Sequence, residues 1–395
     1  MRFTKAWRRK PLRNDLIGWL PQAGSPLTEA AMAVAQLGTE YPELLLTYGP
    51  VARMNPYQAL LYQAAPKHGV AVSELIPMEK LDEVPNLSGL AKRTAVHLHW
   101  INSVIGGAGS QKDANRRVSN FLHRLDLLAE SNVDIVFTIH NKLSHDATFI
   151  DAELALQQGI LDRCAVVHSM TQAGLDSMRD FADIDSDRVI VSGHPLYENV
   201  YPNFLTTEEC RKSLGIRPDE FVLCLFGAIK PYKGLDELRS YWSEYAATCD
   251  GPVRLLVAGA PDNSEEAKRF IDWAISHPSV TIQPTKIPYE QVQLFVKASD
   301  AGVIPYRRTL NSGSAMLHLT FGRPIVTVNE PAVVEGLPHE AYELFSSFDE
   351  FSLALNRIRV RHDSNSPSFT GAVSQSHGVD TISSSFIKQL LSKLC

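Results

Sequence analysis

"FVLCLFGAIKPYKGLDELRSYWSEYAAT", residues 221–248, contains the structural unit that this chain repeats. Residues 221–229 are an apolar run of strand length, and residues 235–248 place apolar side chains at helical spacing. A turn rich in Gly and Pro separates the two segments. Further apolar runs follow, with helical patterns between them, which predicts β/α units and a parallel sheet. These predicted strands cover residues 253–261, 280–287, 301–306 and 324–329.

The first half of the chain shows the same alternation, with predicted helices that include residues 56–69 and 113–131. Residues 202–220 interrupt the alternation and are typical of a linker with a short helix. The pattern therefore predicts an α/β fold with two facing Rossmann-like, doubly wound domains. We expect an N-terminal extension (1–43) with one helix, an N-terminal domain (44–204), a C-terminal domain (205–360), and a flexible loop with a C-terminal helix (361–395).

Composition excludes several classes of protein. The formal net charge of −6 argues against a general nucleic-acid binder. The five cysteines contain no C-x-x-C pair, which favours free thiols in a reducing compartment. No apolar run approaches the ~18–20 residues of a membrane span. We therefore expect a cytoplasmic enzyme, whose basic start "MRFTKAWRRKPLR" is either a solvated tail or a contact with anionic lipid at the inner face of the cell membrane.

Histidines follow several predicted strands of the first domain. His97 and His99 lie on the same side of one strand, because strand side chains alternate. Imidazole titrates near neutral pH and can act as a general base, although a single strand-end histidine can also be structural. The spacing does not match a zinc site. The candidates for a base are Asp146, His145, His140 and His99, and His194 is expected in the same crevice.

Cationic and small residues follow strands of the second domain. Lys230 and Lys233 lie on the turn that begins at Gly227, and two ammonium groups there can hold a diphosphate. The stretch "NSGSAMLHLTFGRP" (311–324) predicts a helix whose first backbone N–H groups are left open for an anion. A solvated turn and a capped core helix are the structural alternatives. The expected diphosphate site comprises Lys230, Lys233, Arg307, Arg308, Asn311, Ser312, Gly313 and Ser314, with Gly227 nearby.

Several other chemistries lack their motifs. "IGGAGSQK" does not have P-loop spacing, and no G-x-G-x-x-G follows the first strand, which argues against a dehydrogenase. The chain has no G-x-S-x-G elbow. Because no D-x-D follows a strand, we expect no metal and no cofactor.

These motifs resemble those of GT-B glycosyltransferases, and more specifically those of bacterial exopolysaccharide glycosyltransferases of the xanthan mannosyltransferase type. The resemblance implies transfer of a hexosyl unit from a nucleotide diphosphate sugar, GDP-mannose or a UDP-sugar, to a glycan or polyprenyl-diphosphate-linked acceptor. It places the nucleotide on the second domain and the acceptor on the first. The matching stretches are "NPYQALLY", "VHLHW", "TIHNKLSHD", "GHP", "FGAIKPYKG" and "VIPYRRTLNSGSAMLHLTFGRPIV".

One position departs from a large retaining family of this fold, which carries a Glu-x7-Glu motif before its Gly-x-Pro. Aligned on Gly322 and Pro324, the two glutamate positions hold Thr309 and Leu317. The usual ribose-binding carboxylate is absent, so the motifs leave the choice of nucleotide open. Lys230, Lys233 and the amides at residues 312–314 suit a metal-independent, inverting reaction. The alternatives are an epimerase of nucleotide sugars with the same fold, and a non-catalytic partner subunit.

Overall fold

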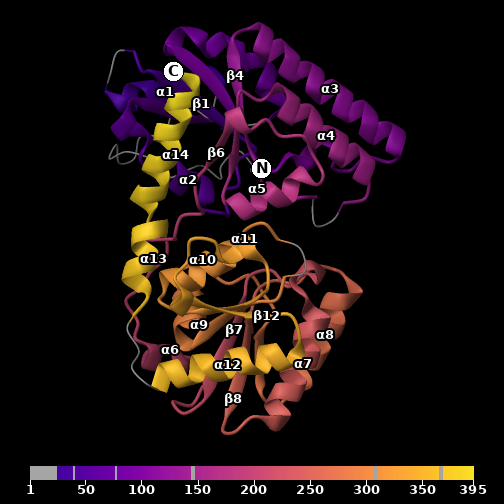
Figure 1. Ribbon diagram of the computed structural model, residues 1–395, viewed down its shortest axis with the longest axis vertical. Helices are drawn as coiled ribbons and strands as arrows, with labels where there is room; N and C mark the ends of the chain where they lie inside the picture. The colour runs from indigo at the N-terminus through magenta and orange to yellow at the C-terminus, as the bar shows by residue number, and fades with distance from the viewer. Residues whose placement is uncertain (1–24, 39–40, 76–77, 144–146, 307–308, 364–367) are drawn as a thin grey trace, which may run out of the picture. The chain divides into compact units, whose positions relative to one another are not determined.

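The computed structural model describes residues 25–38, 41–75, 78–143, 147–306, 309–363 and 368–395. Contacts divide the chain into two compact units (Figure 1). Unit 1 comprises Met1–Met170, Leu175–Ser192 and Ser383–Cys395, and unit 2 comprises Thr171–Gly174 and Gly193–Ile382. The units therefore meet in sequence at residues 192 and 193, whereas the sequence predicts a boundary at 204 and 205. None of the helices in the described part of the chain is long and apolar enough to cross a membrane.

Unit 1 is built on a parallel six-stranded sheet with the order β2-β1-β3-β4-β5-β6. Its buried apolar side chains, such as Leu44, Leu46 and Val136, pack against Phe386 of the C-terminal helix. The strands are β1 (Leu44–Gly49), β2 (Val70–Glu74), β3 (Arg93–Leu98), β4 (Val133–Thr138), β5 (Val166–Ser169) and β6 (Val189–Val191). The helices are α1 (Pro26–Leu37), α2 (Tyr57–Leu61), α3 (Gln111–Glu130), α4 (Ile150–Arg163), α5 (Gln172–Arg179) and α14 (Val379–Leu394), of which α5 and α14 have their first residues in unit 2.

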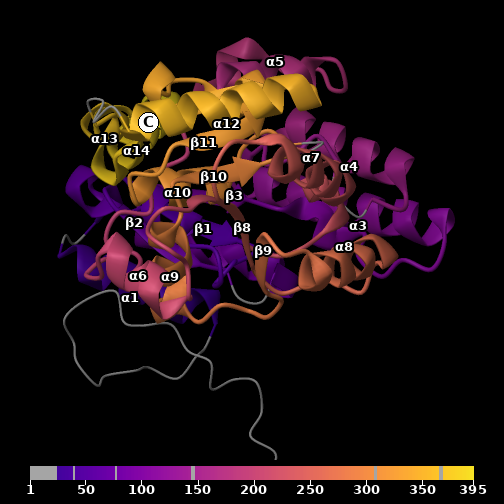
Figure 2. The ribbon, with the colours of Figure 1, turned by 90° about the horizontal axis from the view of Figure 1, so that it is seen from below.

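Unit 2 holds a second parallel sheet with the order β12-β11-β10-β7-β8-β9. Leu223 and Leu225 of β7 pack with α7, α8 and α12 on one face, whereas Val222 and Cys224 pack with α6 and α9 on the other. Figure 2 shows α12 and α9 on opposite sides of β10 and β11. The strands are β7 (Phe221–Phe226), β8 (Val253–Ala258), β9 (Val280–Gln283), β10 (Ala301–Ile304), β11 (Ile325–Val328) and β12 (Tyr342–Phe345). The helices are α6 (Thr207–Ser213), α7 (Leu235–Thr248), α8 (Glu265–Ser276), α9 (Val292–Ala298), α10 (Gly313–Thr320), α11 (Pro331–Val334), α12 (Phe348–Asp363) and α13 (Thr370–His377).

Two segments differ from the sequence-based prediction. The helix expected over residues 56–69 ends at Leu61, and a 3-10 turn follows over Ala65–His68. The Ser383 hydroxyl of α14 donates to the Leu61 carbonyl at 2.7 Å and accepts from the Ala64 N–H at 2.8 Å, which satisfies the groups at the helix end. The segment expected to be a loop after residue 361 contains α13, whose Val373 is buried with Leu196 and Ile304 in unit 2.

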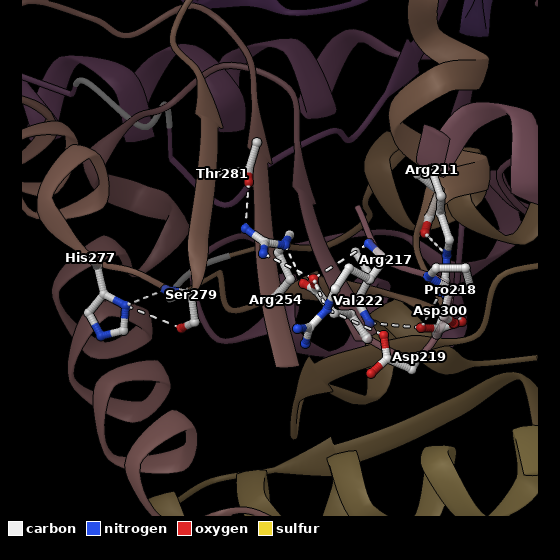
Figure 3. Close-up of polar contacts among 12 residues, drawn as sticks. Arg211, Arg217, Pro218, Asp219, Val222, Arg254, His277, Ser279, Thr281 and Asp300 are labelled. Carbon is white, nitrogen blue, oxygen red and sulfur yellow. Dashed lines mark hydrogen bonds and ion pairs between the residues drawn. The ribbon is translucent and has the colours of Figure 1, made fainter. Parts of the chain in front are cut away.

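A buried ion pair ties together the amino-terminal edge of the second sheet (Figure 3). The Arg211 guanidinium lies 2.8 and 2.7 Å from the two carboxylate oxygens of Asp300. It also donates to the carbonyls of Ala298 and Pro218, and Asp300 accepts the Val222 N–H at 2.7 Å. These contacts join α6, the end of α9 and the start of β7 to the residue that precedes β10.

Replacing Asp300→Asn should lower the free energy of unfolding by about 3 kcal/mol or more, because it leaves the Arg211 charge buried without its partner. The matched control is Asp219→Asn. Asp219 pairs with Arg217 where both side chains are more than 60% exposed, at 65% and 62%, so we expect a change below about 1 kcal/mol. Urea unfolding of both variants measures the difference. Equal losses would show that the buried pair contributes no more than the exposed one.

Candidate functional site

The order of the second sheet brings together two segments that are far apart in sequence. Strands β7 and β10 are neighbours, although β8 and β9 lie between them in the chain. This is a topological switch point, where the loops after the two strands diverge and ligands of doubly wound sheets bind. The loop after β7 carries Gly227, Lys230 and Lys233, and the loop after β10 leads into α10. Both parts of the predicted diphosphate site therefore lie at one switch point.

Lys233 and the start of α10 meet on one backbone oxygen. The Lys233 Nζ donates to the Phe226 carbonyl at 3.1 Å, and the Ser314 hydroxyl donates to the same oxygen at 3.2 Å. Lys233 is buried and its Nζ lies 5.1 Å from the centre of the Tyr306 ring. Burial lowers the pKa of Lys233, because it disfavours the charged form. Gly227 has φ +96°, and a Cβ there would lie 3.0 Å from Nζ, so glycine leaves room for the ammonium group.

The first turn of α10 begins with a side-chain cap, and Tyr197 and His194 lie beside it. Ser312 is the N-cap, and its hydroxyl accepts the Ala315 N–H at 3.2 Å. A Cβ at Gly313 would lie 2.4 Å from the Tyr197 hydroxyl and 3.9 Å from His194 Nε2. His194 donates from Nδ1 to the Pro195 carbonyl at 2.8 Å, and burial lowers its pKa to about 4. His194 is therefore neutral at physiological pH.

His194 is placed differently from the sequence-based expectation. The prediction groups it with the strand-end histidines of the first domain. In the structure β6 ends at Val191, and His194 belongs to unit 2 beside Gly313. It therefore lies at the predicted diphosphate site and not among the histidines of the first sheet.

The remaining predicted residues of this site are placed in part. Lys230 is half-buried and lies immediately before the 3-10 turn Pro231–Lys233. Asn311 is half-buried and precedes the Ser312 cap. Arg307 and Arg308 lie outside the described residues. Leu317, which aligns with the second glutamate of the Glu-x7-Glu motif, is 3% exposed within α10.

The histidines of unit 1 form a hydrogen-bonded chain at the carboxyl edge of its sheet. The Tyr62 hydroxyl lies 2.7 Å from both His97 Nδ1 and His99 Nε2. His99 Nδ1 lies 2.9 Å from His140 Nε2, so His99 is fully buried and bonded at both nitrogens. On the other side, His97 Nε2 lies 2.7 Å from the Thr138 hydroxyl. The structure thus brings His99 and His140 together, as their strand positions predict.

The chain of hydrogen bonds continues to the last strand of the sheet. The Thr138 hydroxyl lies 2.9 Å from His168 Nδ1. His168 Nε2 lies 3.0 Å from both the carbonyl oxygen and the hydroxyl of Ser192. Burial lowers the pKa of His168 to about 4 and lowers the pKa values of His97 and His99 well below their ordinary value. These three imidazoles are therefore neutral.

His140 differs from the other histidines because it lines a small cavity. The cavity has a volume of about 30 Å³, room for roughly one water molecule or one hydroxyl group. Trp100, with φ +31°, stacks on His140 at 4.1 Å between ring centres. A positive φ is unusual for a bulky residue and is often found at functional sites. The other lining residues are Ile101, Asn102, Phe137, Thr138, Asn141, Glu153 and Gln157.

Sequence reasoning missed Glu153 and Gln157. Both lie on α4, are 2% and 6% exposed, and line the cavity. The sequence indicates their burial, because they are spaced i, i+4 on the same helix face as Leu156 and Ile160. Polar side chains on a helix face that is otherwise apolar mark a buried polar site.

Two of the four predicted bases, His145 and Asp146, lie outside the described residues. Within the described ranges, no group of three or more His, Cys, Asp and Glu side chains has the arrangement to hold a metal ion. Of the two placed candidates, His140 lines the cavity and bonds His99 through Nε2, and His99 bonds other protein groups through both ring nitrogens.

Comparison with known proteins points to one fold and one class of enzyme. No family model matches the chain. It is 24% identical over 305 residues to the GDP-mannose:glycolipid 4-beta-D-mannosyltransferase of Xanthomonas campestris pv. campestris, an alignment that covers 77% of each protein.

Solved structures show the same architecture. Anabaena HepE in complex with UDP matches with a TM-score of 0.64 at 15% identity, over 89% of this chain and all of that one. The sucrose-phosphate synthase of Thermosynechococcus elongatus matches with a TM-score of 0.64 at 14% identity, over 89% and 99%. With two Rossmann-like units of six parallel strands each, the chain is a relative of the GT-B glycosyltransferases in both sequence and fold.

Proposed function

We propose that this GT-B glycosyltransferase moves a hexosyl unit from a nucleotide diphosphate sugar to a glycan or lipid-linked oligosaccharide acceptor. Unit 2 binds the donor and unit 1 binds the acceptor hydroxyl. The reaction proceeds without a metal and inverts the anomeric centre. The role is in the synthesis of an exopolysaccharide or another glycoconjugate, and a lipid-linked acceptor would place the reaction at the inner face of the cell membrane.

One observation carries the donor assignment: Lys233 is a buried cation beside a helix N-terminus. Among the residues whose structure is described, no carboxylate pairs with it, and it contacts a carbonyl oxygen and an aromatic face. A buried charge normally has a partner of opposite sign. A diphosphate would supply that charge, and the open N–H groups at Gly313 and Ser314 would add donors to its oxygens.

This arrangement favours the departure of the nucleotide. When the bond between the anomeric carbon and the phosphate oxygen breaks, both electrons go to the diphosphate, so negative charge increases on its oxygens. Lys233, Lys230 and the amides of α10 would bind that charge more strongly in the transition state than in the ground state.

On the acceptor side we propose His140 as the general base. Its ring lines a cavity large enough for a hydroxyl group, with Glu153 and Gln157 as further polar walls. His140 accepts the proton of the acceptor hydroxyl while the oxygen of that hydroxyl forms the bond to the anomeric carbon. His145 and Asp146 remain the alternative bases.

The nature of the nucleotide stays open, because the relatives differ. One relative is named for GDP-mannose and a solved neighbour holds UDP. A panel of UDP, GDP, ADP and dTDP tests binding by thermal shift, since a ligand of the folded state raises its apparent stability. We expect one nucleotide to stand out. Binding of none would favour a non-catalytic partner subunit, and epimerisation of a nucleotide sugar without any acceptor would favour an epimerase.

Lys233→Ala should weaken binding of that nucleotide by about 10- to 100-fold, because it removes a charge-assisted contact worth roughly 1.5–3 kcal/mol. Titration calorimetry measures the change. Lys268→Ala is the control, because Lys268 is 57% exposed on α8 and pairs with Glu265 of the same helix. An unchanged Kd for the nucleotide in Lys233→Ala would contradict the proposal that Lys233 binds the diphosphate.

Gly313→Ala should weaken nucleotide binding about tenfold or more, because its Cβ would overlap the Tyr197 hydroxyl and displace the first turn of α10. The double variant Gly313→Ala/Tyr197→Phe should recover the affinity. Once the hydroxyl is gone, the nearest atom is Tyr197 Cζ at 3.5 Å, an ordinary contact distance. Failure of the second substitution to restore binding would show that the clash is not the cause.

A further inference from the structure

In the hydrogen-bonded chain of unit 1, one backbone group determines which partner donates in each bond. We call this order of donors and acceptors the direction of the chain. His168 Nε2 faces the Ser192 carbonyl, and a carbonyl oxygen can only accept. His168 must therefore carry its proton on Nε2. The opposite tautomer would place a nitrogen lone pair against the carbonyl lone pairs at 3.0 Å. The Ser192 hydroxyl at the same distance can share the N–H as a second acceptor.

Each neutral group in the chain has one proton to donate, so its role in one hydrogen bond determines its role in the next. His168 accepts at Nδ1, so the Thr138 hydroxyl donates its one proton there and accepts from His97 Nε2. His97 then accepts at Nδ1 from the Tyr62 hydroxyl. The Tyr62 oxygen accepts from His99 Nε2.

The last step determines the tautomer of the proposed base. His99 has its proton on Nε2, so its Nδ1 accepts from His140 Nε2. We infer that the chain from Ser192 to His99 holds the His140 proton on Nε2 and makes Nδ1 the nitrogen that accepts the proton of the acceptor hydroxyl. This inference rests on the proposed function of His140, and it makes Tyr62, Thr138 and the three other histidines positioning residues.

The direction depends on neutral imidazoles, because a protonated imidazole donates from both nitrogens. His97, His99 and His168 are each 0% exposed. Burial lowers all three pKa values, and mutual repulsion between neighbouring imidazoles lowers those of His97 and His99 further. The charged form of these three imidazoles is therefore disfavoured.

The chain orients a proton on His140. It holds one proton on Nε2, and the proton of the acceptor hydroxyl is taken up at Nδ1. The arrangement has the same effect as a carboxylate that fixes the tautomer of a catalytic histidine, but it is built from neutral groups.

Thr138→Val should reverse the direction between His97 and His140. Without the Thr138 oxygen, the His97 N–H would be buried without an acceptor, and a buried unpaired donor is costly. Moving that proton to Nδ1 reverses the bonds at Tyr62 and His99 and puts the His140 proton on Nδ1. We expect turnover to fall about tenfold or more, within the ~10²–10⁴-fold that a general base contributes, while nucleotide affinity in unit 2 is unchanged.

Nitrogen NMR of the full chain, labelled with ¹⁵N-histidine, reports the tautomer directly. His140→Gln assigns the His140 signals. We expect an unprotonated Nδ1 in the unmodified protein and a protonated Nδ1 in Thr138→Val. Tyr62→Phe breaks a different link, between His97 and His99, and should give the same change, so the test does not depend on one variant folding.

Thr47→Val is the matched control. Thr47 is a buried residue on β1, the strand beside β3, and its hydroxyl has no hydrogen-bond partner within the described part of the structure. It should keep both the tautomer and the turnover. A protonated Nδ1 in the unmodified protein, or an unchanged tautomer in both Thr138→Val and Tyr62→Phe, would overturn the inference. A reversed tautomer with full turnover would support the assigned direction and overturn the role of His140 as the base.

Discussion

The common direction of the strands is the constraint on which the rest of this structure depends. In each unit all six strands are parallel, so the residues that follow them gather at one edge of the sheet. The parallel arrangement is sufficient to bring side chains that are far apart in sequence together at that edge. Lys233 and Ser314 share the Phe226 carbonyl for this reason, and the histidines that follow β3 and β4 form one hydrogen-bonded chain.

The two edges of the second sheet treat buried charge in opposite ways. At the amino-terminal edge, Arg211 and Asp300 neutralise each other and are saturated by backbone groups. At the carboxyl edge, the buried Lys233 contacts a carbonyl and an aromatic ring. In the first arrangement the two charges are paired with each other within the fold. In the second, an added anion would pair with the lysine. In the first sheet a third arrangement occurs, in which the buried titratable groups are kept neutral.

The hydrophobic periodicity of a segment predicted its secondary structure correctly where tertiary packing buries the same face. Residues 235–248 are helical as expected, and Ser312 caps the helix that follows it. Prediction diverged from the structure where a distant contact decided the outcome. The Ser383 hydroxyl bonds the backbone at the end of α2 from more than 300 residues away in sequence, and the chain path after β6 carries His194 into unit 2. Glu153 lies on α4 and not at a strand end, although its position on an otherwise apolar helix face is visible in the sequence.

The sequence by itself determined the alternation of strands and helices, the polar residues at strand ends and the small residues that open α10. These follow from periods of two and 3.6 residues, which are properties of a local segment. Only the tertiary structure decided that β7 lies beside β10, which joins the lysine turn to the helix start. It alone showed that the Ser192 carbonyl faces His168. Strand order and the direction of a hydrogen-bonded chain depend on which distant groups become neighbours, and no local period encodes that.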